Sequence, residues 1–89
     1  MEHIVKRKGK LEKFDAKKVY GSAYAACLNC HMTRKECNKT ADEVSNGIKK
    51  WIKSKETVTS SQIFKQVAKE LGKHSKDAAF MFETHRDLS

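Results

Sequence analysis

The sequence contains no proline, and only 4 of its 89 residues are glycine. Long flexible linkers, low-complexity tracts and collagen-like repeats are rich in one or both of these residues, so none of them is expected here. No internal repeat is visible. The length fits a single small domain over residues 1–89, and a hydrophobic fraction of 38% can supply one compact core.

Long apolar runs are also missing. No stretch approaches the roughly 18 consecutive apolar residues of a membrane-spanning helix. The opening MEHIVKRKGK has no apolar segment of the kind that a signal peptide carries. We therefore expect no membrane association and a cytoplasmic location, where thiols stay reduced. The cysteines number 3, an odd count that argues against a disulfide framework.

Acidic residues are the minority among the charges. There are 11 Asp and Glu against 19 Lys and Arg, which gives a formal net charge of +8. Such an excess favours anionic partners, namely a nucleotide, a nucleic acid or an acidic protein surface. A lysine-rich surface that only keeps the protein in solution would have the same composition, so charge alone does not identify the partner.

The first segment predicts a β-hairpin followed by a helix. Residues 3–7 and 10–14 flank Lys8-Gly9, and glycine supplies the positive φ that a tight two-residue turn needs. Asp15 suits the N-cap of a helix over residues 16–29. Apolar residues recur along this helix at spacings of three and four: Val19, Tyr20, Ala23, Tyr24, Cys27 and Cys30.

A second helix is predicted from a Thr-x-x-Glu capping box, Thr33 to Glu36, to an end near Lys53. Its apolar residues form one stripe, stepping by four and three: Cys37, Ala41, Val44, Ile48 and Trp51. We expect Trp51 to be a core residue on this stripe. Thr57-Val58 are β-formers that could add a brief third strand.

Two more helices complete the prediction. Thr59 and Gln62 form another capping box, and the helix that they begin is expected to stop at Gly72. Ser75 can cap a fourth helix. Its inward positions are Ala78, Ala79, Phe82 and His85. A small hairpin sheet with four helices belongs to the α+β class.

The densest chemistry lies in VKRKGKLEKFDAKKV, residues 5–19. Cations such as Lys6 and Arg7 can grip phosphates, while Glu12 and Asp15 can accept hydrogen bonds from an adenine amino group or ribose hydroxyls. Three apolar residues could form a wall for a base: Val5, Phe14 and Val19. The ordinary alternative is a charged hairpin whose cations face water.

This segment resembles the opening of the ATP-cone domain, approximately Val-x-Lys-Arg-Asp-Gly-x-x-Glu-x-Phe-[Asp/Asn]-x-x-Lys-[Ile/Val]. The residues in register are Lys6, Arg7, Gly9, Glu12, Phe14, Asp15, Lys18 and Val19. VTSSQIFKQVAKEL is similar to the family's Val-Thr-Ser-x-x-Ile-x-x-x-Val-x-x-x-Leu, and DAAFMFETHR resembles its closing Ala-x-x-Tyr-x-x-Tyr-Arg. The three blocks occur in the right order and span essentially the whole chain.

The chain departs from the family pattern at three places. Lys8-Gly9 replaces the usual Asp-Gly turn and adds a cation close to the expected phosphate site. Phe82 and His85 stand where the family has tyrosines, so a hydroxyl contact is not carried over. Phe64 occupies a position at which some members place a polar residue or histidine beside the ribose.

The resemblance implies a four-helix domain capped by a short three-stranded mixed sheet, which binds ATP or dATP between sheet and helices. By analogy Lys6 and Arg7 hold phosphates, Glu12 and Asp15 face the adenine, and Lys18 lies close by. Phe14, Val19 and Ile63 would line the base pocket, with Thr59, Ser60 and Arg86 at its edge. Mg²⁺ would be optional, bound mainly by phosphate oxygens and water.

ATP-cones serve as regulatory modules at the N-terminus of ribonucleotide reductase large subunits and in a transcriptional repressor of reductase genes. The resemblance therefore implies a nucleotide sensor without catalysis, acting in trans on a reductase or another regulated protein, or through its own oligomeric state. No Walker phosphate loop is present in the sequence. Two alternatives remain open: a basic nucleic-acid-binding or transcription-regulatory domain, and a protein-interaction domain of cone fold that has lost its nucleotide.

CLNCHM is a second motif with chemical potential, because Cys-x-x-Cys-His is the attachment signature of a c-type haem. Haem attachment would need export, and no signal peptide is seen. The same segment with one further cysteine offers four zinc ligands: Cys27, Cys30, His31 and Cys37. Because all three cysteines fall on inward helical positions, we interpret them as small hydrophobic core residues.

Overall fold

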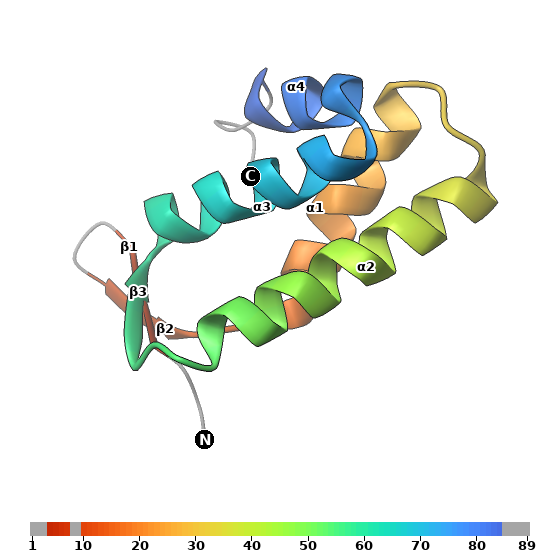
Figure 1. Ribbon diagram of the computed structural model, residues 1–89. Helices are drawn as coiled ribbons and strands as arrows, with labels where there is room; N and C mark the ends of the chain where they lie inside the picture. Colours follow the sequence, from red (N-terminus) through yellow and green to blue (C-terminus); the bar gives the residue numbers. More distant parts are fainter. Residues whose placement is uncertain (1–3, 8–9, 85–89) are drawn as a thin grey trace.

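The computed structural model of the chain describes residues 4–7 and 10–84, and within the first strand only the Val5 side chain is described (Figure 1). In chain order the elements are β1 (Ile4–Arg7), β2 (Lys10–Lys13), α1 (Ala16–Asn29), α2 (Arg34–Ile52), β3 (Thr57–Thr59), α3 (Ser60–His74) and α4 (Lys76–Thr84). The described residues thus contain the four predicted helices, with the short strands gathered at one end of them (Figure 1).

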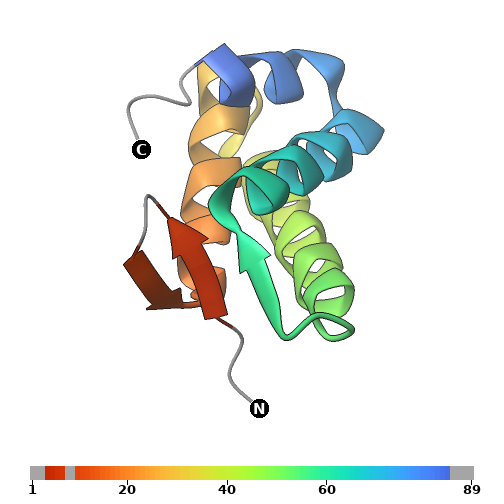
Figure 2. The ribbon, with the colours of Figure 1, turned by 90° about the vertical axis from the view of Figure 1, so that its left-hand side faces the viewer.

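The strands are arranged in the order β2-β1-β3. β1 pairs antiparallel with β2 and parallel with β3, so that Val5 lies opposite Glu12 on one side and Val58 on the other. Figure 2 shows β1 between its two neighbours and β3 leading directly into α3. The parallel pairing brings the first strand beside the start of the third helix.

Each predicted helix cap is confirmed. The Asp15 carboxylate accepts a hydrogen bond from the backbone N–H of Lys17 at 2.9 Å, and reciprocal capping boxes begin both α2 and α3. The Ser75 hydroxyl accepts from the N–H of Ala78 at 3.1 Å. These bonds satisfy N–H groups that have no partner within the helix, which is why the first residue of each helix agrees with the capping signals.

The core has two parts. The larger part, between the helices, includes the fully buried side chains of Cys27, Cys37, Val44, Ile48 and Leu71. The smaller part lies where the strands meet the helices and consists of Val5, Ile52 and Val58. Three half-buried residues pack against both parts: Phe14, Trp51 and Ile63. The prediction that Trp51 belongs to the core is confirmed.

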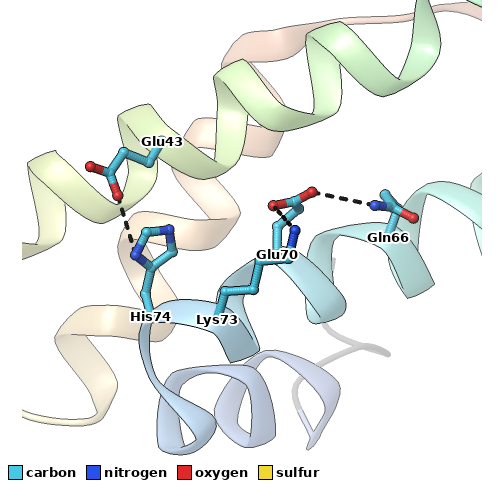
Figure 3. Close-up of polar contacts among 5 residues, drawn as sticks. All are labelled: Glu43, Gln66, Glu70, Lys73 and His74. Atoms are coloured by element: carbon cyan, nitrogen blue, oxygen red, sulfur yellow. Dashed lines mark hydrogen bonds and ion pairs between the residues drawn. The ribbon is translucent and has the colours of Figure 1, made fainter.

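Polar residues join α2 to α3 along their outer edge (Figure 3). The Glu70 carboxylate lies over Gly47, where a Cβ atom would be only 3.1 Å from Glu70 Cδ, and it pairs with Lys73 Nζ at 3.4 Å. His74 Nδ1 lies 3.2 Å from Glu43 Oε2, which connects the end of α3 to α2. Glycine at position 47 therefore gives the space into which the glutamate packs.

The structure corrects the predicted end of the third helix. The helix continues through Gly72 to His74, and it ends because Ser75 adopts an extended conformation (φ −158°, ψ 119°) while capping the next helix. The second strand also ends at Lys13, one residue before Phe14. The Lys8-Gly9 turn and the predicted inward position of His85 lie outside the described residues.

Candidate functional site

The hairpin–α1 junction, residues 5–19, is the predicted nucleotide site. Its backbone geometry follows from the strand order: Lys6 is the register partner of Leu11 on β2 and of Thr59 on β3. Thr59 is also the N-cap of α3, where the positive end of the helix dipole favours anions. The side chains of Lys6 and Arg7, and all of Arg86, lie outside the part of the chain that the structure describes.

Three charged residues of the junction are exposed to solvent. Glu12 lies on the outer strand β2, and Asp15 and Lys18 lie at the beginning of α1. Asp15 has a structural task as well, since one of its carboxylate oxygens caps the helix at 2.9 Å from the Lys17 nitrogen. Each of the three side chains is therefore accessible from solvent without opening the core.

The predicted apolar wall is divided between surface and interior. Val5 and Val19 are 8% and 7% exposed, so they are core residues. Phe14 and Ile63 are half-buried, and both pack against the two parts of the core. Only these latter two have enough exposed surface to touch a base, with the valines supporting them from behind.

Thr59 and Ser60 lie at the start of α3. The Thr59 hydroxyl accepts a hydrogen bond from the Gln62 N–H at 3.1 Å, and the Gln62 side-chain carbonyl accepts from the Thr59 N–H at 2.9 Å. Thr59 is exposed and Ser60 is half-buried. The capping box occupies the N–H groups of Thr59 and Gln62 and fixes the start of α3 directly after β3, the strand that pairs with β1.

A groove between α3 and α4 was not anticipated from the sequence. It is lined by Ser61, Phe64, Lys65, Ala68, Lys69 and Glu83. Beside it the ring of Phe64 stacks on that of Phe82, with centroids 4.6 Å apart. The groove shares no residue with the predicted nucleotide site, although it begins one residue after Ser60. The available signal was the pair of phenylalanines: Phe64, where some members of the family place a polar residue or histidine, and Phe82, where the family has a tyrosine.

The α1–α2 connection, residues 27–37, contains CLNCHM. After the C-cap residue Cys30, the His31 N–H bonds to the Leu28 carbonyl at 3.0 Å and the Met32 N–H bonds to the Cys27 carbonyl at 3.2 Å. This is the Schellman pattern of helix termination. His31 takes the left-handed conformation that the pattern requires, with φ 66°. The segment is therefore the end of a helix, and backbone N–H groups just beyond it bond to the Cys27 and Leu28 carbonyl groups.

The thiols of this connection face inward or bond to backbone. Cys27 and Cys37 are buried, the Cys37 thiol donates to the Met32 carbonyl at 3.7 Å, and burial raises the pKa of Cys27 to about 11. Cys30 is half-buried and its thiol donates to the Cys27 carbonyl at 3.3 Å. Among the residues that the structure describes, no group of three or more His, Cys, Asp or Glu side chains is arranged to hold a metal ion.

No helix within residues 4–7 and 10–84 is long and apolar enough to cross a membrane.

Comparison with known proteins identifies the family. The family model of the ATP cone domain matches residues 2–84, which include every described helix and strand. No curated protein and no solved structure gives a significant match to the chain. ATP-cone domains are generally regulatory, non-catalytic modules that bind ATP or dATP. On the extent of this match, the chain belongs to the ATP-cone domain family.

Proposed function

We propose that this chain binds ATP or dATP at the hairpin–α1 junction and acts as a nucleotide sensor without catalysing a reaction. The observation that carries the proposal is the family match over residues 2–84, and the exposed Glu12, Asp15 and Lys18 and the half-buried Phe14 of the junction support it. Charged side chains and a partly exposed aromatic ring suit a ligand with an anionic end and a flat base.

In this proposal Lys6 and Arg7 hold the phosphates, beside the end of α3 that Thr59 caps. Lys18 lies close by, and Glu12 and Asp15 face the adenine. Phe14 and Ile63 contact the base, with Val5 and Val19 behind them, and Ser60 and Arg86 contribute at the edge. Support for the phosphate end comes from the β1–β3 register, which sets the backbone of Lys6 beside the α3 N-terminus.

Mg²⁺ is optional in this scheme, because the cations of the junction already balance phosphate charge. Binding is proposed to occur without rapid hydrolysis. The regulatory output is proposed to reach a ribonucleotide reductase or another regulated protein in trans, or to act through the oligomeric state of the chain itself.

Titration with ATP, dATP and ADP, followed by calorimetry and two-dimensional NMR, tests the proposal. We expect saturable binding with shifts concentrated in residues 5–19 and 57–63. Lys6→Ala should weaken ATP binding by about tenfold or more, since a charge-assisted hydrogen bond contributes about 1.5–3 kcal/mol. Lys73→Ala is the matched control, because Lys73 pairs with Glu70 on α3 and belongs to no part of the proposed site.

Two results would contradict this assignment. If the chemical shifts of the hairpin did not change at millimolar nucleotide, the alternative of a protein-interaction domain of cone fold without a ligand would be favoured. ATP turnover that disappears in Lys6→Ala would contradict the non-catalytic part of the proposal.

A further inference from the structure

Basic residues gather at the C-terminal end of α2. The segment KKWIKSK, residues 49–55, contains 4 lysines and no acidic residue. Lys49, Lys50 and Lys53 are exposed, and among the described residues none of them is joined to an acidic side chain. We call these three lysines the α2-end surface. They lie within about one helical turn, so their ammonium groups can act on one anionic partner together.

The two apolar residues of this segment pack against the core. Ile52 is 2% exposed, and Trp51 is half-buried between the two parts of the core. Lys55 Nζ lies over the Trp51 ring, 5.1 Å from its centroid, so a cation occupies one face of the ring. The α2-end surface therefore presents cations without a hydrophobic anchor.

The fold adds a further exposed lysine on the side of α2 next to this surface. The Ser45 hydroxyl lies 3.5 Å from the Ala16 carbonyl oxygen, so that α1 begins beside the C-terminal half of α2 (Figure 1). Lys17, which is distant in sequence from the α2-end surface, is exposed at this start of α1, while its neighbour Lys18 is assigned to the nucleotide site. The neighbouring acids in the sequence are Asp15 and Glu56, and they leave a local excess of positive charge.

We propose that the α2-end surface binds the phosphate backbone of nucleic acid, independently of base sequence and at a place separate from the nucleotide site. Protein interfaces are depleted in lysine and rely on a hydrophobic core, and membrane-surface binding relies on exposed apolar anchors. The α2-end surface consists of lysines, and it contains neither a hydrophobic core nor an apolar anchor. Lysine is a point charge, whereas base reading uses Arg, Asn and Gln, so the phosphates are the part that is recognised.

Fluorescence anisotropy with a duplex of arbitrary sequence and about 30 base pairs tests this inference, between about 50 and about 200 mM salt without nucleotide. The triple variant Lys49→Glu, Lys50→Glu and Lys53→Glu should bind at least about tenfold more weakly at the lower salt. Its slope of log affinity against log salt should be smaller by about 2 to 3, because each lost phosphate contact removes about 0.9.

The matched control carries Lys35→Glu, Lys39→Glu and Lys76→Glu, three exposed lysines elsewhere on the helices. Each Lys→Glu change lowers the charge by 2, so both triple variants go from +8 to +2. We expect the slope of the control variant to change by less than about a third of the change seen for the α2-end variant. Circular dichroism and thermal unfolding verify that both variants are folded.

Equal losses in the two variants would overturn the inference in favour of diffuse charge attraction, and so would an absence of duplex binding at low salt. Tighter binding to polyglutamate or to anionic vesicles than to the duplex, at equal salt, would assign the surface to another partner and also overturn it. ATP affinity of the α2-end variant should stay within about twofold of the parent protein. Failure of the parent protein to bind ATP would contradict the proposed function alone and leave this inference standing.

Discussion

The hairpin–α1 junction and the α1–α2 connection lie at opposite ends of α1 and use their polar groups in opposite ways. In the junction Glu12, Asp15 and Lys18 are exposed, and one carboxylate oxygen of Asp15 caps α1. In the connection the thiols of Cys27 and Cys37 are buried, and the Cys37 thiol donates a hydrogen bond to the Met32 carbonyl. The motif that has the composition of a metal site is thus mostly buried, whereas the charged side chains of the hairpin–α1 junction are exposed to solvent.

The difference shows that accessibility decides which region can do chemistry. A buried thiol with a raised pKa is a poor nucleophile and a poor metal ligand, because both roles need the thiolate. An exposed carboxylate or ammonium group keeps its charge and can change partners. Substitutions in the junction should therefore alter ligand binding at little cost in stability, and substitutions in the connection should do the reverse.

The largest expected effect tests how the strands are held. Ile52→Ala and Ile48→Ala remove equal volumes from the smaller and larger parts of the core, and each should lower the free energy of unfolding by about 2–5 kcal/mol. Urea unfolding measures this loss. Only Ile52→Ala should also speed hydrogen exchange in β1 and weaken ATP binding, because Ile52 is the helix residue that is buried with Val5 of β1 and Val58 of β3. Equal exchange in both variants would show that the two parts open together.

Serine in place of a core cysteine should have the next largest effect. Cys27→Ser and Cys37→Ser each place a hydroxyl in a buried site and should cost about 1–3 kcal/mol, since the new group is poorly hydrogen bonded. ATP affinity measured by calorimetry should be unchanged. A loss of ATP affinity in the still-folded variants would connect the two regions and end the contrast between them.

Alkylation of the parent protein gives the matching control for the thiols. At pH 8 Cys27 should react slowly with iodoacetamide, because its pKa is raised to about 11 by burial. Mass spectrometry should find the half-buried Cys30 modified first. Faster modification of Cys27 would contradict the closed arrangement of the connection.

The two capping boxes offer a smaller and more discriminating comparison. Thr33→Ala and Thr59→Ala each remove a side chain that accepts a backbone N–H bond, so each should destabilise by about 1 kcal/mol in thermal unfolding. Only Thr59→Ala should weaken ATP binding, because its helix begins beside β1. If both variants bound ATP equally well, the end of α3 would have no part in the site.

The smallest expected effect is a gain in stability. His31 has a positive φ of 66°, a conformation that costs a side chain with a Cβ atom roughly 1–2 kcal/mol. His31→Gly should therefore stabilise the protein by about 0.5–1 kcal/mol after the greater freedom of glycine in the unfolded chain is allowed for. Asn29→Gly, two residues earlier and still helical, should destabilise it. Metal-dependent destabilisation of His31→Gly would reopen the zinc interpretation.

Much of the fold was predictable because its signals are local. The Thr33–Glu36 and Thr59–Gln62 boxes act over three residues, so they begin helices wherever those residues occur. The predicted end of α3 at Gly72 was wrong because a glycine without a positive φ does not end a helix. The helix continues for two more residues to His74 and is followed by the extended Ser75. Within the candidate site, helical spacing already predicted an inward position for Val19, whereas the burial of Val5 could not be predicted, since it depends on β3 and α2 from distant parts of the chain.

By itself the sequence determined the α+β class, the starts of the four helices and membership of the ATP-cone family, because caps, periodicity and ordered motifs are carried by short stretches of residues. Only the tertiary structure decided that β1 pairs with β3 beside the α3 N-terminus, that the cysteines are enclosed, and that the start of α1, with its exposed Lys17, lies beside α2. The physical reason is that burial and proximity between distant segments are set by packing, and packing is a property of all the elements at once.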